Sequence, residues 1–266
     1  MNKKRLLMGG AVLSVVVAAL LIIKETRRIL IYGVVRQEPD VNGKYMSEWL
    51  EDLSSPDDDT RFQATASLQT MGHKAAKALP ELARLMNEGK SLRIRAGASF
   101  CIFKIAADVN QSGGHTPELL DALIRALDDP EGIVRMNAAL ALGTMKADAR
   151  RAVPDLVKAI QRKENRVAVL EFTTTIAEHM IADLGAIGPE ARDAVDTLEE
   201  ALQDEDKTMR RFAARALGRI GPDAKHALEL LVKTVEDKSE DAEVQDCARE
   251  AIRLIDPQRA QNLTGR

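Results

Sequence analysis

The amino-acid sequence predicts an all-α fold: an α-α superhelix, or solenoid, of about five to six helical hairpins, preceded by one N-terminal transmembrane helix. Three observations predict it. Aromatic residues make up only 3% of the 266 residues and apolar residues 45%, so the core consists mainly of Ala, Leu, Val and Ile, of which Ala and Leu favour helices. One residue pattern recurs every 33 to 42 residues, and an uncharged apolar run lies near the N-terminus.

Charge and cysteine content narrow the function classes. The 38 Lys and Arg residues nearly cancel the 41 Asp and Glu residues, which leaves a formal charge of -3. Proteins that coat nucleic acids are usually basic, so this balance disfavours a nucleic-acid partner. Cys101 and Cys247 lie far apart and outside any CxxC or Cys/His cluster. We expect them to be small buried or half-buried thiols rather than a disulfide or metal ligands.

Residues 1–28 are predicted to form an N-terminal tail and a transmembrane anchor. The uncharged run Leu6–Ile23 holds 18 residues, which give a helix of about 27 Å, close to the roughly 30 Å hydrocarbon thickness of a bilayer. A cleaved signal peptide has a shorter apolar region followed by small residues. Lys24 and Glu25 follow the run here, so we expect a retained anchor.

The orientation of this anchor is set only weakly by charge, because basic residues flank the run on both sides. By analogy with uncleaved signal anchors, we expect a single-pass protein of the bacterial inner membrane with its repeat region outside the cytoplasm. Residues 29–44 are interrupted by Gly33, Pro39 and Gly43 and are predicted to form a juxtamembrane linker.

An internal repeat organises the rest of the chain. Val134–Ile160 and Met209–Val235 each contain an Arg, then Ala-Ala at the third and fourth positions after it, then Ala-Leu-Gly at the sixth to eighth. The repeat Arg stands at Arg61, Arg95, Arg135 and Arg210, and Ala177 and Gln245 fill its position in two degenerate copies. The spacings of 34, 40, 42, 33 and 35 residues each suit one helix pair. Residues 45–256 are therefore predicted to be the repeat domain, its last copy a C-terminal cap, and residues 257–266 a tail.

Each part of the pattern has a physical role. The first helix of a pair follows an acidic turn, such as residues 57–59 or 204–206, whose carboxylates cap backbone N–H groups and interact favourably with the helix dipole. The alanines form a narrow apolar stripe that lets neighbouring helices approach closely. Gly ends the first helix and Pro suits the first turn of the next. One pair cannot bury both of its faces, so the copies must stack.

Two copies depart from the pattern. The second carries the longer segment Val109–Glu118 between its helices, in place of a tight Gly-Pro turn. The fourth has about ten extra residues, Glu164–Thr173, and has Asp183 where the pattern expects Ala. An unpaired buried carboxylate is costly, so we expect Asp183 to face a groove or to pair with a neighbour.

The strings R-x-x-A-A-x-A-L-G-x-I-G-P and A-V-P-x-L resemble HEAT-repeat proteins, in particular the bacterial, armadillo-like class shared with phycobilisome (PBS) lyases. The resemblance covers about Tyr45–Asp256. It implies an α solenoid, a fold that serves scaffolds, lyase subunits and hydroxylases alike. The expected function is a scaffold or adaptor that binds a protein partner. The alternative is a lyase-like or cofactor-handling enzyme subunit related to bilin lyases.

No constellation of catalytic residues stands out. The four histidines, His73, His115, His179 and His226, fall at unlike positions in different copies, and none precedes a Glu as in the iron-binding HEAT-like hydroxylases. Phosphate-binding loops and the GxSxG and HExxH motifs are absent from the sequence. We therefore expect no enzyme activity, catalytic residue, metal, cofactor or small-molecule substrate.

The predicted functional site is the concave face of the solenoid. In HEAT-like arrays the helices of one type line that face, and the non-Ala positions of the repeat point toward it. The predicted partner-binding residues are Phe62, Phe100, Lys104, Met136, Asn137, Leu140, His179, Arg211, Phe212, Arg215 and Arg219. Large apolar side chains flanked by Arg are typical of partner sites. Two alternatives remain: curvature buries the apolar residues, or the arginines pair with the acidic residues 204–206.

Overall fold

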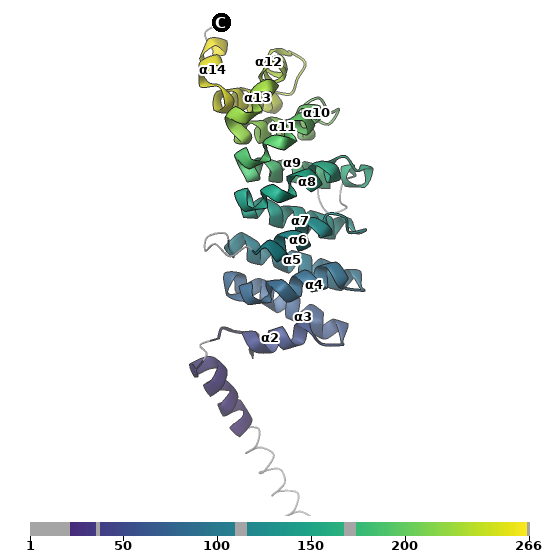
Figure 1. Cartoon of the computed structure of the whole chain (residues 1–266), viewed down its shortest axis with the longest axis vertical. Coiled ribbons are helices and arrows are strands. Elements are labelled where there is room, and N and C mark those ends of the chain that lie inside the picture. The colour runs from purple at the N-terminus through teal and green to yellow at the C-terminus, as the bar shows by residue number, and fades with distance from the viewer. Residues whose placement is uncertain (1–21, 36–37, 110–115, 168–173, 265–266) are drawn as a thin grey trace, which may run out of the picture.

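The computed structural model describes residues 22–35, 38–109, 116–167 and 174–264, and shows an elongated stack of helix pairs (Figure 1). The first helices of the six copies are α3 (Asp58–Leu68), α5 (Leu92–Val109), α7 (Gly132–Met145), α9 (Ile176–Ile187), α11 (Lys207–Ile220) and α13 (Ala242–Ile255). The second helices are α4 (Leu79–Glu88), α6 (Pro117–Ala126), α8 (Val153–Ile160), α10 (Val195–Ala201) and α12 (Leu228–Glu236). The predicted all-α solenoid is confirmed.

The two rows of helices pack differently. Each first helix packs directly against the next one along the whole stack. From α6 onward, the second helices contact the next copy through its first helix and its 3-10 turn rather than through its second helix: α6 contacts η3 (Lys146–Ala152), α8 contacts η5 (Gly188–Ala194) and α10 contacts η6 (Gly221–Ala227). The first-helix row is therefore the more closely packed of the two rows.

The tight turns require glycine because the backbone enters the left-handed region there. Eleven residues after the repeat position, Gly72, Gly188 and Gly221 have φ of 55°, 81° and 77°. Lys146 holds the same position in the third copy with φ 51°, a conformation that side chains other than glycine adopt at a cost. The second copy has Ala106 there, and α5 runs on to Val109 without a turn. The second copy thus has a longer first helix and no turn at this position.

The acidic turns cap the first helices as predicted. Asp57 accepts a hydrogen bond from the backbone N–H of Thr60 (2.8 Å), and Asp206 accepts one from that of Thr208 (2.6 Å). In the fourth copy Thr175 is the N-cap of α9 and forms a reciprocal capping box with Glu178. Thr175 therefore serves as the helix cap in this copy.

The repeat arginine forms hydrogen bonds within its own turn and ion pairs that link consecutive copies. Arg210 donates to the backbone carbonyls of Asp204 (2.8 Å) and Glu205 (2.9 Å) in its own turn, and pairs with Glu240 of the following turn (2.7 Å). Arg95 bonds the Gly89 carbonyl (3.2 Å) and pairs with Asp129, 34 residues on (2.8 Å). Because a charged donor here satisfies buried or half-buried carbonyls, this arginine has a structural role in every copy that carries it.

The N-terminal end closes on the first pair through a short hairpin. Strands β1 (Asp40–Val41) and β2 (Lys44–Tyr45) pair antiparallel, and α2 (Met46–Leu53) follows. Trp49 is buried in the core, where its indole N–H donates to the Val41 carbonyl (3.0 Å). A helical segment at 22–35 precedes the hairpin, and its Arg28 pairs with Glu48 (2.7 Å). The expected linker is thus partly helix and partly strand.

Two further expectations concern the ends of the chain. Most of the predicted anchor, residues 1–21, lies outside the described residues. Within the part that the structure describes, no helix combines the length and apolar character needed to cross a bilayer. At the other end, most of the predicted tail is a helix, α14 (Pro257–Thr264), that packs on α13. It forms because Pro257 suits a first helical turn and Asp256 caps the N–H groups of Gln258 and Arg259.

Candidate functional site

The candidate site is the solvent-facing side of the first-helix row. We call it the first-helix face and define it as the side chains 1, 2, 5 and 9 residues after the repeat position. Phe100, Lys104, Arg215 and Arg219 are exposed on it. Phe100 is 44% exposed, a high fraction for a large apolar side chain in a folded domain. The structure therefore brings these four predicted residues onto one continuous surface of consecutive helices.

Met136 and Asn137 correct the sequence prediction. Both are buried, at 5% and 3% exposure, so neither lies on the surface. The amide of Asn137 donates to the hydroxyl of Ser99 on α5 (3.0 Å), and Met136 belongs to the hydrophobic core. The start of α7 is more deeply covered than that of α5 or α11: even its repeat Arg135 is buried, whereas Arg95 and Arg210 are half-buried.

Three apolar members of the set are half-buried. Phe62, Leu140 and Phe212 pack against the core while keeping one side toward solvent. The guanidinium of Arg93 lies 4.0 Å from the centroid of the Phe62 ring, and that of Arg211 lies 5.4 Å from the Phe212 ring. The expectation that curvature buries apolar residues thus holds in part, and Phe100 is the most exposed aromatic side chain on the described part of this face.

Helix α9 carries the polar residues nearest the middle of the face. His179 is half-buried, its Nε2 lies 3.1 Å from the Thr174 hydroxyl, and burial lowers the pKa of its imidazole. Glu178 is buried, and burial raises the pKa of its carboxyl. Asp183 is 7% exposed and its Oδ2 has no hydrogen-bond partner. Burial raises the pKa of Asp183 well above its ordinary value, and its buried, unpaired Oδ2 departs from the expected groove-facing or paired charge.

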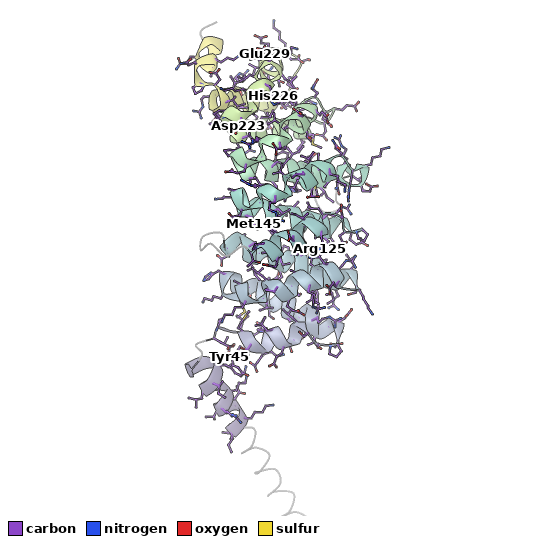
Figure 2. The ribbon with its side chains drawn as sticks, in the orientation of Figure 1. Tyr45, Arg125, Met145, Asp223, His226 and Glu229 are labelled. Atoms are coloured by element: carbon purple, nitrogen blue, oxygen red, sulfur yellow. The ribbon has the colours of Figure 1, made fainter. Side chains whose placement is uncertain are left out.

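Sequence reasoning missed a group at the edge of the stack. His226, labelled in Figure 2, places Nδ1 2.9 Å from Glu199 and Nε2 3.9 Å from Asp196. The three could be taken for a metal site. A metal ion binds one nitrogen of an imidazole, whereas the two carboxylates here face different nitrogens. The arrangement suits a double ion pair with protonated His226. The sequence signal for this group was that Glu199 and His226 stand in consecutive copies.

A cleft of about 430 Å³ lies on the opposite row, between α4 and α6. Leu79, Ala83 and Leu119 form apolar lining, and Arg84 and Arg125 (Figure 2) lie among its charged lining residues. The cleft was not predicted, because it depends on the spacing between two second helices. The cysteines behave as expected: both are free thiols, Cys101 buried and Cys247 half-buried, and burial raises the pKa of Cys101 to about 12.

Comparison with known protein families gives one match. The family described as HEAT repeats matches residues 100–177 and 172–253, which together span more than half of the chain. No curated protein matches the sequence.

Solved structures share the architecture. An engineered protein aligns with a TM-score of 0.60 at 23% identity, over 80% of this chain and 96% of its own. A designed armadillo repeat protein in complex with the peptide (KR)4 aligns with a TM-score of 0.61 at 20% identity, over 80% of this chain and all of its own. The complex of CpcE and CpcF of phycocyanin lyase from Nostoc sp. PCC7120 aligns with a TM-score of 0.54 at 23% identity, over 80% and 79%. At these identities the likeness concerns the fold.

Proposed function

We propose that this chain, which belongs to the HEAT-repeat family, is a scaffold that binds a protein partner on its first-helix face. The observation that carries the proposal is Phe100, a large aromatic side chain 44% exposed on α5, within a continuous row of helices. Lys104 lies one turn further along the same helix and is also exposed. An aromatic anchor beside a cation is a common centre of protein interfaces.

The solenoid suits this role mechanically. Each first helix packs on both neighbours, and arginines such as Arg95 and Arg210 tie each turn to the following one. The face is thus held in place before a partner arrives, which lowers the entropic cost of binding. The designed armadillo repeat protein with a bound peptide supports the proposal as an example of the same architecture in a binding role.

A substitution on α5 tests the proposal. Crosslinking in native membranes measures capture of the partner. Phe100→Asp should abolish the crosslinked product, because it places a charge at the centre of the apolar contact. Leu92→Asp is the matched control, since Leu92 lies on the same helix with nearly the same exposure, 43%, but outside the face. Equal loss of capture in both variants, or no loss in Phe100→Asp with helicity intact, would refute the face as the binding site.

We also propose that the N-terminal segment holds the scaffold at a membrane, with the repeats outside the cytoplasm. The apolar run Leu6–Ile23 supports this, as does a gathering of exposed apolar side chains on the described part of the segment: Ile22, Ile23, Ile29 and Leu30. The full chain should remain in the membrane pellet after carbonate extraction. A reporter fused after Arg266 should be active on the outer side. Release into the supernatant would contradict the anchor.

A second candidate is a lyase-like subunit that handles a cofactor. Its support is the likeness to the CpcE and CpcF complex, which concerns the fold. This candidate predicts that a pigment or metal copurifies with the chain. Absorbance spectra and elemental analysis of the protein from its native source measure this, and a colourless, metal-free preparation would argue against it.

A further inference from the structure

We propose that the C-terminal part of the first-helix face, formed by Arg215 and Arg219 with Leu254 beside them, binds an acidic segment of the protein partner. This inference rests on the proposed function and specifies the chemistry of the partner. We call the three residues the arginine shelf. Its basis is a difference in pairing between the two halves of α11.

The cationic side chains in the N-terminal half of α11 form ion pairs with the last copy. Lys207 pairs with Asp241 (2.9 Å), Arg210 with Glu240 (2.7 Å) and Arg211 with Glu243 (2.5 Å). These arginines and this lysine therefore have structural partners within the chain. The predicted ion pairs with residues 204–206 are wrong: Arg210 bonds the backbone carbonyls of Asp204 and Glu205, and the carboxylate partners come from the copy after it.

The C-terminal half of α11 is different. Arg215 and Arg219 are exposed, and among the described residues neither has an ion-pair or hydrogen-bond partner. Acidic side chains do lie on the neighbouring α13, but they are already engaged. Asp246 pairs with Arg249 (2.5 Å) and Glu250 pairs with Arg253 (2.5 Å), both within α13 itself. The two guanidinium groups thus keep all of their donors for another molecule.

The surroundings leave room for that molecule. On α9 the corresponding positions are Ala182 and Ala186, whose short side chains cannot cover the arginines. The Arg219 stem leans on α9, since its Cδ lies 3.4 Å from where a Cβ of Gly185 would be. On the other side Leu254 is 42% exposed and contacts the Gly218 position. The shelf therefore places two exposed guanidinium groups beside an apolar wall.

This geometry specifies the occupant. Side chains four residues apart on a helix have Cβ atoms about 6 Å apart, so Arg215 and Arg219 match a pair of carboxylates at similar spacing. Guanidinium groups bind carboxylates through two parallel hydrogen bonds. The structure thus favours a partner segment with two acidic residues one helical turn apart and a leucine-like residue that packs on Leu254.

A binding experiment with a defined probe tests the proposal. The full chain in detergent micelles is titrated into a fluorescein-labelled peptide of four Glu-Glu-Ala-Leu units, with the Gln-Gln-Ala-Leu peptide as its uncharged counterpart. We expect salt-sensitive binding of the acidic peptide, weakened about tenfold or more in R215E/R219E. K74E/K77E is the control, because it reverses two exposed cations in the first copy, away from α11, and leaves the partners of the shelf's neighbours unchanged. It should bind nearly as wild type does.

Three outcomes would overturn the inference. The peptides could bind equally, or both double variants could lose binding equally. Dioctanoylphosphatidylserine could displace the peptide and bind more tightly through the same arginines, which would assign the shelf to a lipid. The failure of this inference can be told apart from the failure of the proposed function. If the wild type captures its partner, F100D does not and R215E/R219E captures it fully, then the proposed function stands and only the acidic-segment inference falls.

Discussion

Two junctions between consecutive first helices show how the stack is held together and where it is weak. Between α11 and α13, a Cβ on Gly218 would lie only 2.9 Å from the Cα of Ala251. Between α7 and α9, the residue opposite Gly143 is Asp183, whose carboxyl fills the space that a Cβ of Gly143 would need. The first junction is a close contact of small residues, and the second contains a buried acid without a full set of partners.

The difference teaches that the repeat specifies a contact between copies as much as a helix pair. Glycine in one copy receives alanine from the next, so the backbones approach closely, as they also do at Gly185 and Ala216. The α7/α9 junction keeps the same arrangement although Asp183 disturbs it. The flanking copies thus hold a locally unfavourable contact in place.

The largest effect is expected from filling the close junction. Gly218→Val should destabilise the chain by about 3 kcal/mol, because the added carbons meet the backbone of α13, which cannot move aside as a side chain can. Urea unfolding measures the change. Ala182→Val, at a half-exposed position on the same row, is the control and should cost far less. Equal costs would show that the junction is not close-packed.

Removing the buried acid should act in the opposite direction. Asp183→Ala should stabilise the chain by about 1 to 3 kcal/mol at neutral pH, because it removes a buried carboxyl whose Oδ2 is unpaired and restores the alanine of the other junctions. The same urea experiment measures this. A loss of stability in Asp183→Ala would mean that the carboxyl makes a favourable interaction in the fold.

Part of that effect should depend on pH. Burial raises the pKa of Asp183 well above 3.8, its ordinary value, so the folded chain holds this proton more tightly than the unfolded chain does. The stabilising contribution is present below the unfolded pKa and is lost as pH rises through the higher folded pKa. As pH rises from 3.8 through the raised folded pKa, wild type should therefore lose stability relative to Asp183→Asn. A constant difference across this range would contradict the assignment.

A smaller gain is expected at the turn of the third copy. Lys146 has φ 51° where three other copies have glycine, so Lys146→Gly should raise stability by about 1 kcal/mol through relief of backbone strain. Lys146→Ala should give no such gain, since alanine is strained there too. Thermal unfolding of both variants measures the difference, and equal melting temperatures would show that the turn is unstrained.

Much of the fold was predictable because the repeat records its own packing. The spacing of Arg, Ala-Ala and Ala-Leu-Gly identified the first helices, and the missing Gly-Pro turn of the second copy marked the region where α5 runs on to Val109. The structural role of Arg95 and Arg210 was missed, although an acidic turn recurs near each of their partners and offered a signal.

The site was less predictable, because exposure depends on neighbours that a single copy does not specify. The repeat position is the same for Asn137 and Phe212, yet Asn137 is buried and Phe212 is half-buried. Asn137 is held inward by its hydrogen bond to Ser99 of α5. Pairing has the same limit: Arg211 and Arg215 differ in partners because Glu243 is within reach of only one of them.

The central claim is that the first-helix face receives the partner, and photocrosslinking tests it most directly. A photoreactive amino acid replaces Lys104 on α5 in one variant, and Lys158, an exposed lysine of the second helix α8, in the other. After irradiation of native membranes, position 104 should yield one crosslinked product that R215E/R219E or F100D diminishes, and position 158 should yield none. The same product from position 158 at equal or greater yield would contradict the claim.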